Sequence, residues 1–81
     1  AKELGAHGIR VNAVAPTVTM TELAAAAWSD PSKKEPMMVR HPMGRFAETE
    51  DVAKSIVMLL SDDAPMITGA VIPIDGGFLA V

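Results

Sequence analysis

Residues 10–21 read Arg10-Val11-Asn12-Ala13-Val14-Ala15-Pro16-Thr17-Val18-Thr19-Met20-Thr21, an apolar run that passes directly into a turn rich in hydroxyl groups. The run from Val11 to Ala15 is nearly continuous, which is typical of a parallel strand covered on both faces. Pro16 ends the expected strand because it has no N–H to donate to a ladder. Open α/β sheets bind ligands at the carboxyl ends of their strands, so the sequence predicts a ligand site at Pro16 to Thr21.

A second apolar run, residues 69–77, predicts another strand that ends in an Asp-Gly-Gly turn. Pro73 within this run favours an edge position in the sheet. Between the two runs, residues 49–60 predict an amphipathic helix, because apolar side chains recur there at three- and four-residue spacing, namely Val52, Ala53, Ile56, Leu59 and Leu60. A strand, a helix and a strand in this order indicate an α/β fold with a parallel sheet.

The segment between the first strand and this helix is expected to hold short helical pieces. An alanine-rich helix is predicted over residues 22–28, and a second over 33–40 after a turn at 29–32. Pro36 and Pro42 are expected to interrupt any longer helix, and the methionines nearby give the segment a soft apolar surface. Such a segment suits a flap that moves.

The composition excludes several classes of function. Net charge is −3 and the seven Lys and Arg residues are scattered, so a nucleic-acid surface is not expected. No apolar stretch approaches the roughly 20 residues of a membrane-spanning helix. The chain has no cysteine, and His7 and His41 lack partners at metal-ligand spacing, so we expect no metal site and two solvated histidines. A cytoplasmic protein fits this composition.

The chain of 81 residues is expected to be a piece of a longer α/β domain rather than an autonomous one. A domain of this size buries only roughly 60% of its unfolded surface. Two parallel strands also need helices on both faces, and the chain predicts too few of them. Residues 1–5 read as the last turn of a helix closed by a glycine.

The two strands, their order and the helix between them resemble the C-terminal third of a short-chain dehydrogenase/reductase. Residues 9–12, Ile-Arg-Val-Asn, match the lead into the sixth strand of that family, and residues 67–77 match the seventh. The chain is most similar to the dicarbonyl and L-xylulose reductase group, since Thr17 follows Pro16 and Trp28-Ser29-Asp30-Pro31 comes at the matching distance. The implied fold is the last part of a doubly wound Rossmann-type sheet, with a substrate lid at about residues 20–45.

The resemblance implies an oxidoreductase that moves a hydride between NADP(H) and a small dicarbonyl or ketose, with NAD(H) still open as the cofactor. The implied cofactor-binding residues are Pro16, Thr17, Val18, Thr19 and Thr21, with backbone groups near Val18 and Thr19 meeting the nicotinamide carboxamide. Trp28 is implied to line the substrate pocket. Members of the family use a Ser, a Tyr and a Lys for catalysis; this chain has no Tyr and no catalytic residue is assigned in it. A homotetramer is the implied assembly.

Several alternatives stay open at this point. Thr21 fits the N-cap of the helix near Glu22 as well as a ligand contact. Trp28 could instead pin the lid to the core, and Arg40 and Arg45 fit surface ion pairs better than cofactor phosphate contacts. A non-catalytic truncated product, or activity like that of a 3-oxoacyl carrier-protein reductase, would each fit the same sequence.

Overall fold

The computed structural model describes residues 1–80 and has two parallel strands with one long helix between them in the chain. Strand β1 spans Ala13–Pro16 and strand β2 spans Val71–Ile74, paired in parallel from Ala13 opposite Val71 to Pro16 opposite Ile74. Helix α3 spans Thr49–Leu60. The predicted α/β architecture is therefore confirmed.

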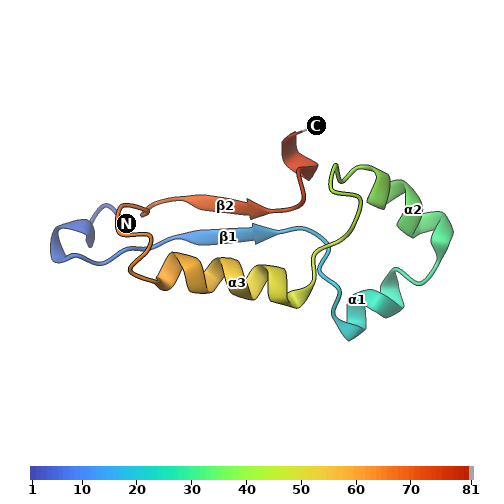
Figure 1. The fold of residues 1–81 in the computed structure, drawn as a ribbon, viewed down its shortest axis with the longest axis horizontal. Helices are drawn as coiled ribbons and strands as arrows, with labels where there is room; N and C mark the ends of the chain where they lie inside the picture. The colour runs from blue at the N-terminus through green and yellow to red at the C-terminus, as the bar shows by residue number, and fades with distance from the viewer. Residues whose placement is uncertain (81) are drawn as a thin grey trace.

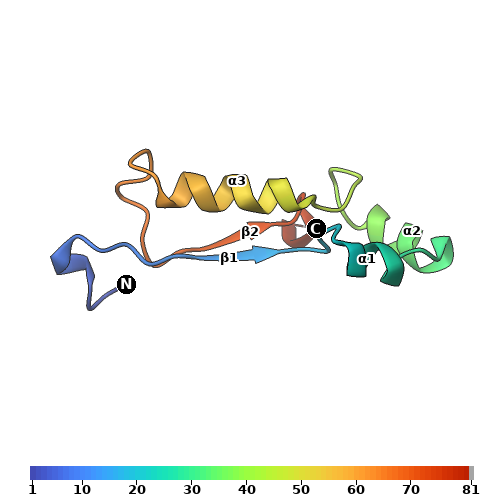
Figure 2. The same cartoon turned by 90° about the horizontal axis from the view of Figure 1, so that it is seen from below.

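The remaining elements are short. Helix α1 spans Glu22–Ala27 and helix α2 spans Pro31–Val39, while single 3₁₀ turns occupy Gly5–His7 and Phe78–Ala80. Figure 1 shows α1 and α2 beyond the carboxyl ends of both strands, where the predicted lid segment falls. In the view of Figure 2, α3 runs along one face of the strand pair, and no α-helix of residues 1–80 covers the opposite face.

Strand β1 starts two residues later than predicted, because the backbone around Val11 bonds to a loop instead of a ladder. The Val11 N–H donates to Thr68 Oγ1 at 3.1 Å, and the Val11 carbonyl accepts from Gly69 N at 2.8 Å. The carbonyls of Ala70, just before β2, and of Ile74, at its end, accept hydrogen bonds from the β1 segment. Because alternate residues of a strand face the same neighbour, Pro73 points its N toward the outer edge. The missing N–H of Pro73 therefore costs no bond to β1, which agrees with the predicted edge position.

Two predictions about these elements are wrong: the glycine that closes the N-terminal turn and the burial of Leu60. The predicted helix over residues 33–40 is found as α2, which accommodates Pro36 because the missing N–H lies one turn into an exposed helix and the carbonyl left without it, that of Ser32, is exposed to water. At the N-terminus, the left-handed residue that closes the turn is Gly8, with φ of 72°, and not Gly5. In α3, Leu59 is buried as expected, but Leu60, about 100° further round the helix, is 77% exposed.

The buried core is small and is divided between the two ends of α3. Phe46, Ala47 and the polar residue His41 precede α3, whereas Leu59 lies near its end and Ala64 in the loop that follows. Many large apolar side chains stay exposed, among them Val57 on α3 and Val71 on β2. Apolar surface of this extent is what remains when a parallel strand pair has a helix on one face only.

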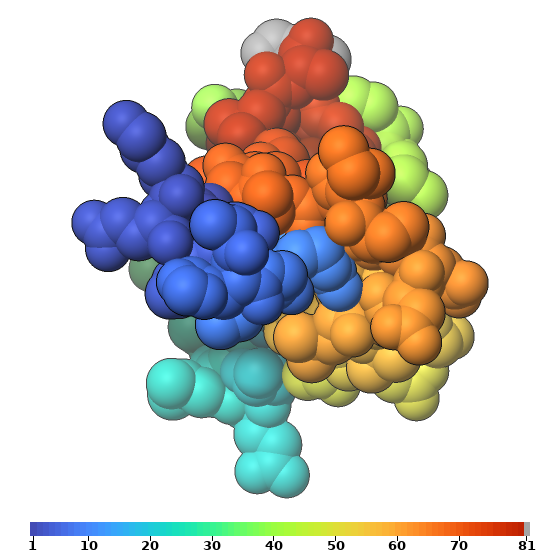
Figure 3. Space-filling model, turned by 90° about the vertical axis from the view of Figure 1, so that its left-hand side faces the viewer, coloured from blue at the N-terminus to red at the C-terminus, as the bar shows by residue number. Residues whose placement is uncertain are grey.

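Arg10 and Asn12 hold the opposite end of the molecule together. The Arg10 guanidinium donates to the carbonyls of Leu59 at 2.6 Å, Ser61 at 3.1 Å and Ile67 at 3.2 Å. The Asn12 amide donates to the Ile67 carbonyl at 2.8 Å and accepts from Ala70 N at 3.1 Å. Figure 3 looks onto this end, where the N-terminal segment lies against the loop between α3 and β2.

We expect Arg10→Met to lower the free energy of unfolding by about 2 kcal/mol, the range for hydrogen bonds to a charged group. The substitution keeps much of the side-chain volume but leaves the half-buried carbonyls at the end of α3 without their donor. Chemical denaturation of the protein that carries this chain measures the loss. Lys2→Met, at an exposed position, is the matched control, and equal effects of the two substitutions would contradict the anchoring role.

Candidate functional site

The turn at Pro16 to Thr21 leaves β1 at its carboxyl end, as predicted, and is fixed there by a second stretch of chain. The Met20 N–H donates to the Ala47 carbonyl at 2.8 Å, and the Ala47 N–H donates to the Val18 carbonyl at 3.0 Å. These two bonds make a parallel bridge between Thr19 and Ala47. The candidate site is therefore a backbone structure tied to the buried core at Phe46 and Ala47.

The three threonine hydroxyls of this turn are all engaged within the chain. Thr19 Oγ1 donates to the Thr17 carbonyl at 2.9 Å, and Thr17 Oγ1 lies 2.7 Å from Nε2 of His41. Thr21 Oγ1 accepts from Ala24 N at 3.1 Å, so the predicted N-cap of α1 is confirmed. An accepting hydroxyl keeps its own proton, which leaves Thr21 able to donate to a ligand as well.

The free donors of the turn are on its backbone. Within residues 1–80, the N–H groups of Val18 and Thr19 have no hydrogen-bond acceptor, whereas those of Thr17, Met20 and Thr21 are bonded to carbonyls. Two adjacent free N–H groups suit a ligand oxygen, such as that of an amide or a phosphate. In the turn that the sequence predicts as a ligand site, the available donors are thus mainly backbone N–H groups, since the threonine hydroxyls have partners within the chain.

His41 is buried, with 2% of its surface exposed, so the prediction of a solvated histidine is wrong. The ring nitrogens are both paired, Nδ1 with the Met37 carbonyl at 3.0 Å and Nε2 with Thr17 Oγ1. Phe46 and Phe78 pack on the ring with centroids 5.4 and 5.1 Å away. No local sequence signal marks this contact, since Thr17 and His41 are 24 positions apart. His7, in contrast, is exposed as predicted.

Trp28 ends helix α1 and is half-buried. Its ring meets Phe46 edge to face, with centroids 5.5 Å apart and planes at 62°. This contact joins the predicted lid to the core, and it leaves part of the ring exposed. Both interpretations of Trp28, as a pin for the lid and as a pocket wall, are compatible with this position.

Arg40 and Arg45 take different partners. The Arg45 guanidinium pairs with the Asp51 carboxylate at 2.8 Å, which confirms the predicted surface ion pair. Arg40 places its guanidinium 4.6 Å from the centroid of the Phe78 ring and has no ion pair among residues 1–80. Arg40 and His41 thus both contact Phe78, which joins the end of α2 to the turn after β2.

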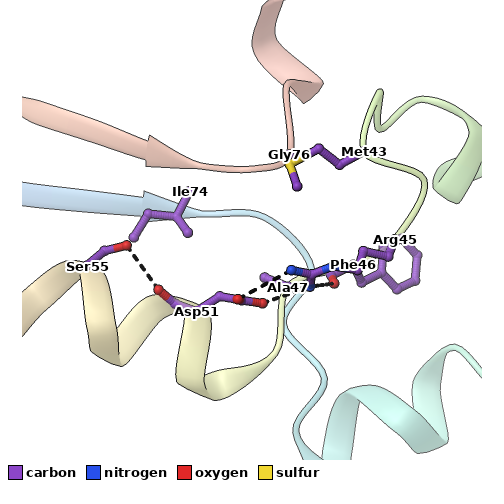
Figure 4. A pocket seen from close by; sticks show the side chains of 8 residues that line it. All are labelled: Met43, Arg45, Phe46, Ala47, Asp51, Ser55, Ile74 and Gly76. Carbon is purple, nitrogen blue, oxygen red and sulfur yellow. Dashed lines mark hydrogen bonds and ion pairs between the residues drawn. The ribbon is translucent and has the colours of Figure 1, made fainter.

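A cavity of about 230 Å³ opens beside the carboxyl end of β2. Figure 4 shows its lining, with the Arg45–Asp51 pair across one side and Ile74 and Met43 on the other; the full set is Met43, Arg45, Phe46, Ala47, Asp51, Ser55, Ile74 and Gly76. The arginine at the mouth is already neutralised by Asp51, so the cavity presents no free cationic group from these residues to a ligand.

Asp51 carries the most perturbed pKa at the site. The hydrogen bond from Arg45 and a second one from the Glu48 N–H lower the pKa of the carboxyl from 3.8 to about 2. The pKa of Arg45 is raised in turn by the same pair. Asp51 sits in the first turn of α3, where a negative charge also complements the helix dipole.

Two kinds of site are not found in the described part of the chain. Among residues 1–80 no group of three or more His, Cys, Asp or Glu side chains could hold a metal ion. No helix over the same residues is long and apolar enough to cross a membrane.

The chain is similar to known reductases over nearly its whole length. A family model described as "Enoyl-(Acyl carrier protein) reductase" matches residues 1–79. L-xylulose reductase of Bos taurus is 60% identical over 99% of this chain, and carbonyl reductase (NADPH) 2 of Sus scrofa is 49% identical over 99%. A short-chain type dehydrogenase/reductase from Mycobacterium ulcerans superposes over 98% of the chain with a TM-score of 0.92 and 39% identity.

These matches cover only part of each relative. The chain spans about a third of the length of the two reductases, 33% of the bovine protein for example, and 29% of the solved structure. The similarity therefore covers the fold of these residues, while about two thirds of each relative has no counterpart among them.

We expect Asp51→Asn to lower thermal stability at neutral pH and to weaken its dependence on acid. The folded pKa is depressed, so this pair stabilises the fold fully above pH 3.8 and loses that effect as the pH falls toward about 2. Melting temperatures of the variant and of the unsubstituted protein, measured from about pH 2 to neutral pH, test this expectation. Asp62→Asn, in an exposed loop without an ion pair in residues 1–80, is the control, and parallel curves for the two variants would contradict the prediction.

Proposed function

Because the chain belongs to the short-chain dehydrogenase/reductase family, we propose that it forms the nicotinamide-side wall and substrate lid of an NADP(H)-dependent carbonyl reductase. The substrates proposed are small dicarbonyls or ketoses such as L-xylulose. One observation carries the proposal: two adjacent N–H groups, of Val18 and Thr19, are free at the carboxyl end of a parallel strand. That position is where sheets of this class hold nucleotides.

The residues present fit a nicotinamide group. Its carboxamide oxygen needs a donor, which the N–H of Val18 or Thr19 would supply, and the Thr21 proton is available beside them. Pro16 would contribute by ending the strand and opening the turn. In this proposal NADP(H), when bound, supplies the hydride that reduces the substrate carbonyl. NADP(H) is preferred over NAD(H) because one relative is named as an NADPH enzyme, while NAD(H) stays an alternative.

The share of this chain in the reaction would be placement. Backbone groups that are already fixed by Ala47 orient a bound ring without reorganising, which lowers the entropy cost of reaching a reactive geometry. Residues 20–45 would form the lid, and its closure would exclude water. The chain has no Tyr, so the Ser, Tyr and Lys that the resemblance implies would come from another part of the protein.

Residues 1–80 expose apolar side chains, which supports their packing against further chain or against other subunits. Val57 on α3 and Val71 on β2 are 65% and 66% exposed. We propose that the partial Rossmann domain described here is completed by further chain, and that the full-length protein forms a tetramer. The cytoplasmic location also stays a prediction.

The assay that tests the proposal follows NADPH oxidation by the full-length protein that contains residues 1–81. We expect turnover with L-xylulose and with a small diketone, and much slower turnover with NADH. Faster turnover of a 3-oxoacyl thioester would favour the carrier-protein reductase alternative, to which the family description lends some support. A protein that neither binds nor oxidises a nicotinamide nucleotide would support the non-catalytic alternative.

We expect Trp28→Ala to raise the KM for the sugar about tenfold, or ~1.4 kcal/mol, with little change in NADPH affinity. The exposed part of the ring would contact substrate, while the cofactor donors lie in the turn at 16–21. Trp28→Phe keeps an aromatic edge against Phe46 and serves as the matched control. If both variants lose stability while KM stays constant, Trp28 only pins the lid to the core.

A further inference from the structure

His41 is the buried polar residue of the described chain, and the structure fixes its tautomer. The Met37 carbonyl can only accept, so Nδ1 of His41 must carry the hydrogen that spans the 3.0 Å between them. In the neutral ring Nε2 is then the acceptor, and the Thr17 hydroxyl donates to it across 2.7 Å. Both ring nitrogens are thereby satisfied, as burial requires.

The ring is also fixed by packing. Phe46 meets it at 71° and Phe78 at 40°, with both centroids within 5.4 Å. These two residues come from the loop before α3 and from the turn after β2, while Met37 belongs to α2. His41 therefore joins the lid segment, the core and the end of β2 at one point, and it presents a single acceptor to the turn at 16–21.

A chain of hydrogen bonds passes from His41 into the ligand turn. Thr17 donates to the histidine, and the Thr17 carbonyl accepts from the Thr19 hydroxyl at 2.9 Å. With its proton held by His41, the Thr17 hydroxyl is not free to donate to a ligand. The two threonines instead hold the backbone on either side of Val18, whose N–H is one of the two free donors.

We propose that His41, acting through Thr17, is a positioning residue that orients the free N–H groups of Val18 and Thr19 toward the nicotinamide carboxamide. This inference rests on the proposed function, and it changes the role of Thr17 from a ligand contact to a support of the turn. His41 touches neither cofactor nor substrate in this role. Its effect is confined to the nicotinamide half of the cofactor, because the turn that it supports belongs to that half alone.

The test compares two ligands on the full-length protein: NADPH, and an adenosine bisphosphate that shares the adenine half of NADPH but lacks the nicotinamide. For His41→Leu we expect NADPH to bind about tenfold more weakly, ~1.4 kcal/mol, with the affinity for adenosine bisphosphate unchanged. His41→Gln should recover most of the loss, because its amide oxygen can accept from Thr17. His7→Leu, at the exposed histidine, is the matched control.

A double-mutant cycle with Thr17→Val isolates the bond itself. We expect the double variant to bind NADPH no more weakly than either single variant, since both remove the same interaction. Ring-nitrogen NMR shifts of the unsubstituted protein give a second readout that needs no variant: they should report the Nδ1–H tautomer for His41 and no hydrogen on Nε2.

Several outcomes would overturn the inference. Unchanged NADPH affinity in His41→Leu, an equal loss for both ligands, additive effects in the cycle, or an Nε2–H tautomer would each do so. Failure of the proposed function gives a different result, namely an unsubstituted protein that binds no nicotinamide nucleotide at all. If the protein prefers NADH, AMP replaces adenosine bisphosphate and the expectations are the same.

Discussion

The return of the chain from α3 to β2 depends on Arg10 and Asn12, and the rest of the structure depends on that return. A helix of twelve residues must deliver the chain back alongside β1, in register, before two parallel strands can pair. Arg10 donates to three carbonyls at the end of α3 and in the following loop. Asn12 donates to the Ile67 carbonyl in the same loop and accepts from the N–H of Ala70, the last residue before β2. Side chains just before β1 thus determine where β2 begins.

The other end of the strand pair is joined by a different stretch, residues 41–47. His41 bonds to the turn after β1, the Met43 N–H donates to the Gly76 carbonyl after β2 at 3.1 Å, and Ala47 bridges Thr19. Gly77 allows this close approach, because it has a φ of 92° and a Cβ there would lie 2.9 Å from Pro42 Cγ. The ligand turn is consequently surrounded by fixed backbone, although it lies at the end of a two-stranded sheet.

The sequence predicted the features that depend on residues close together in the chain. The apolar runs located both strands, the three- and four-residue spacing located α3, and the hydroxyl before Glu22 located the cap of α1. The burial of His41 was missed because it comes from partners distant in sequence, Thr17 and Phe78 among them, and a histidine before a proline has no pattern of its own. Pro36 stays inside the short helix predicted around it, because one lost N–H in an exposed helix costs less than one in a buried helix.

The proposed site would select its cofactor through backbone groups and its substrate through side chains. Its free donors are backbone N–H groups, and the hydroxyls of Thr17 and Thr19 hold that backbone in place. A backbone N–H is present whatever side chain the residue carries, so the turn would bind the carboxamide that all nicotinamide cofactors share. Discrimination between substrates would then fall to side chains of the lid, where Trp28 lies against Phe46 with part of its ring exposed. Cofactor contact and substrate choice would thus lie on different segments, joined through the core residues Phe46 and His41.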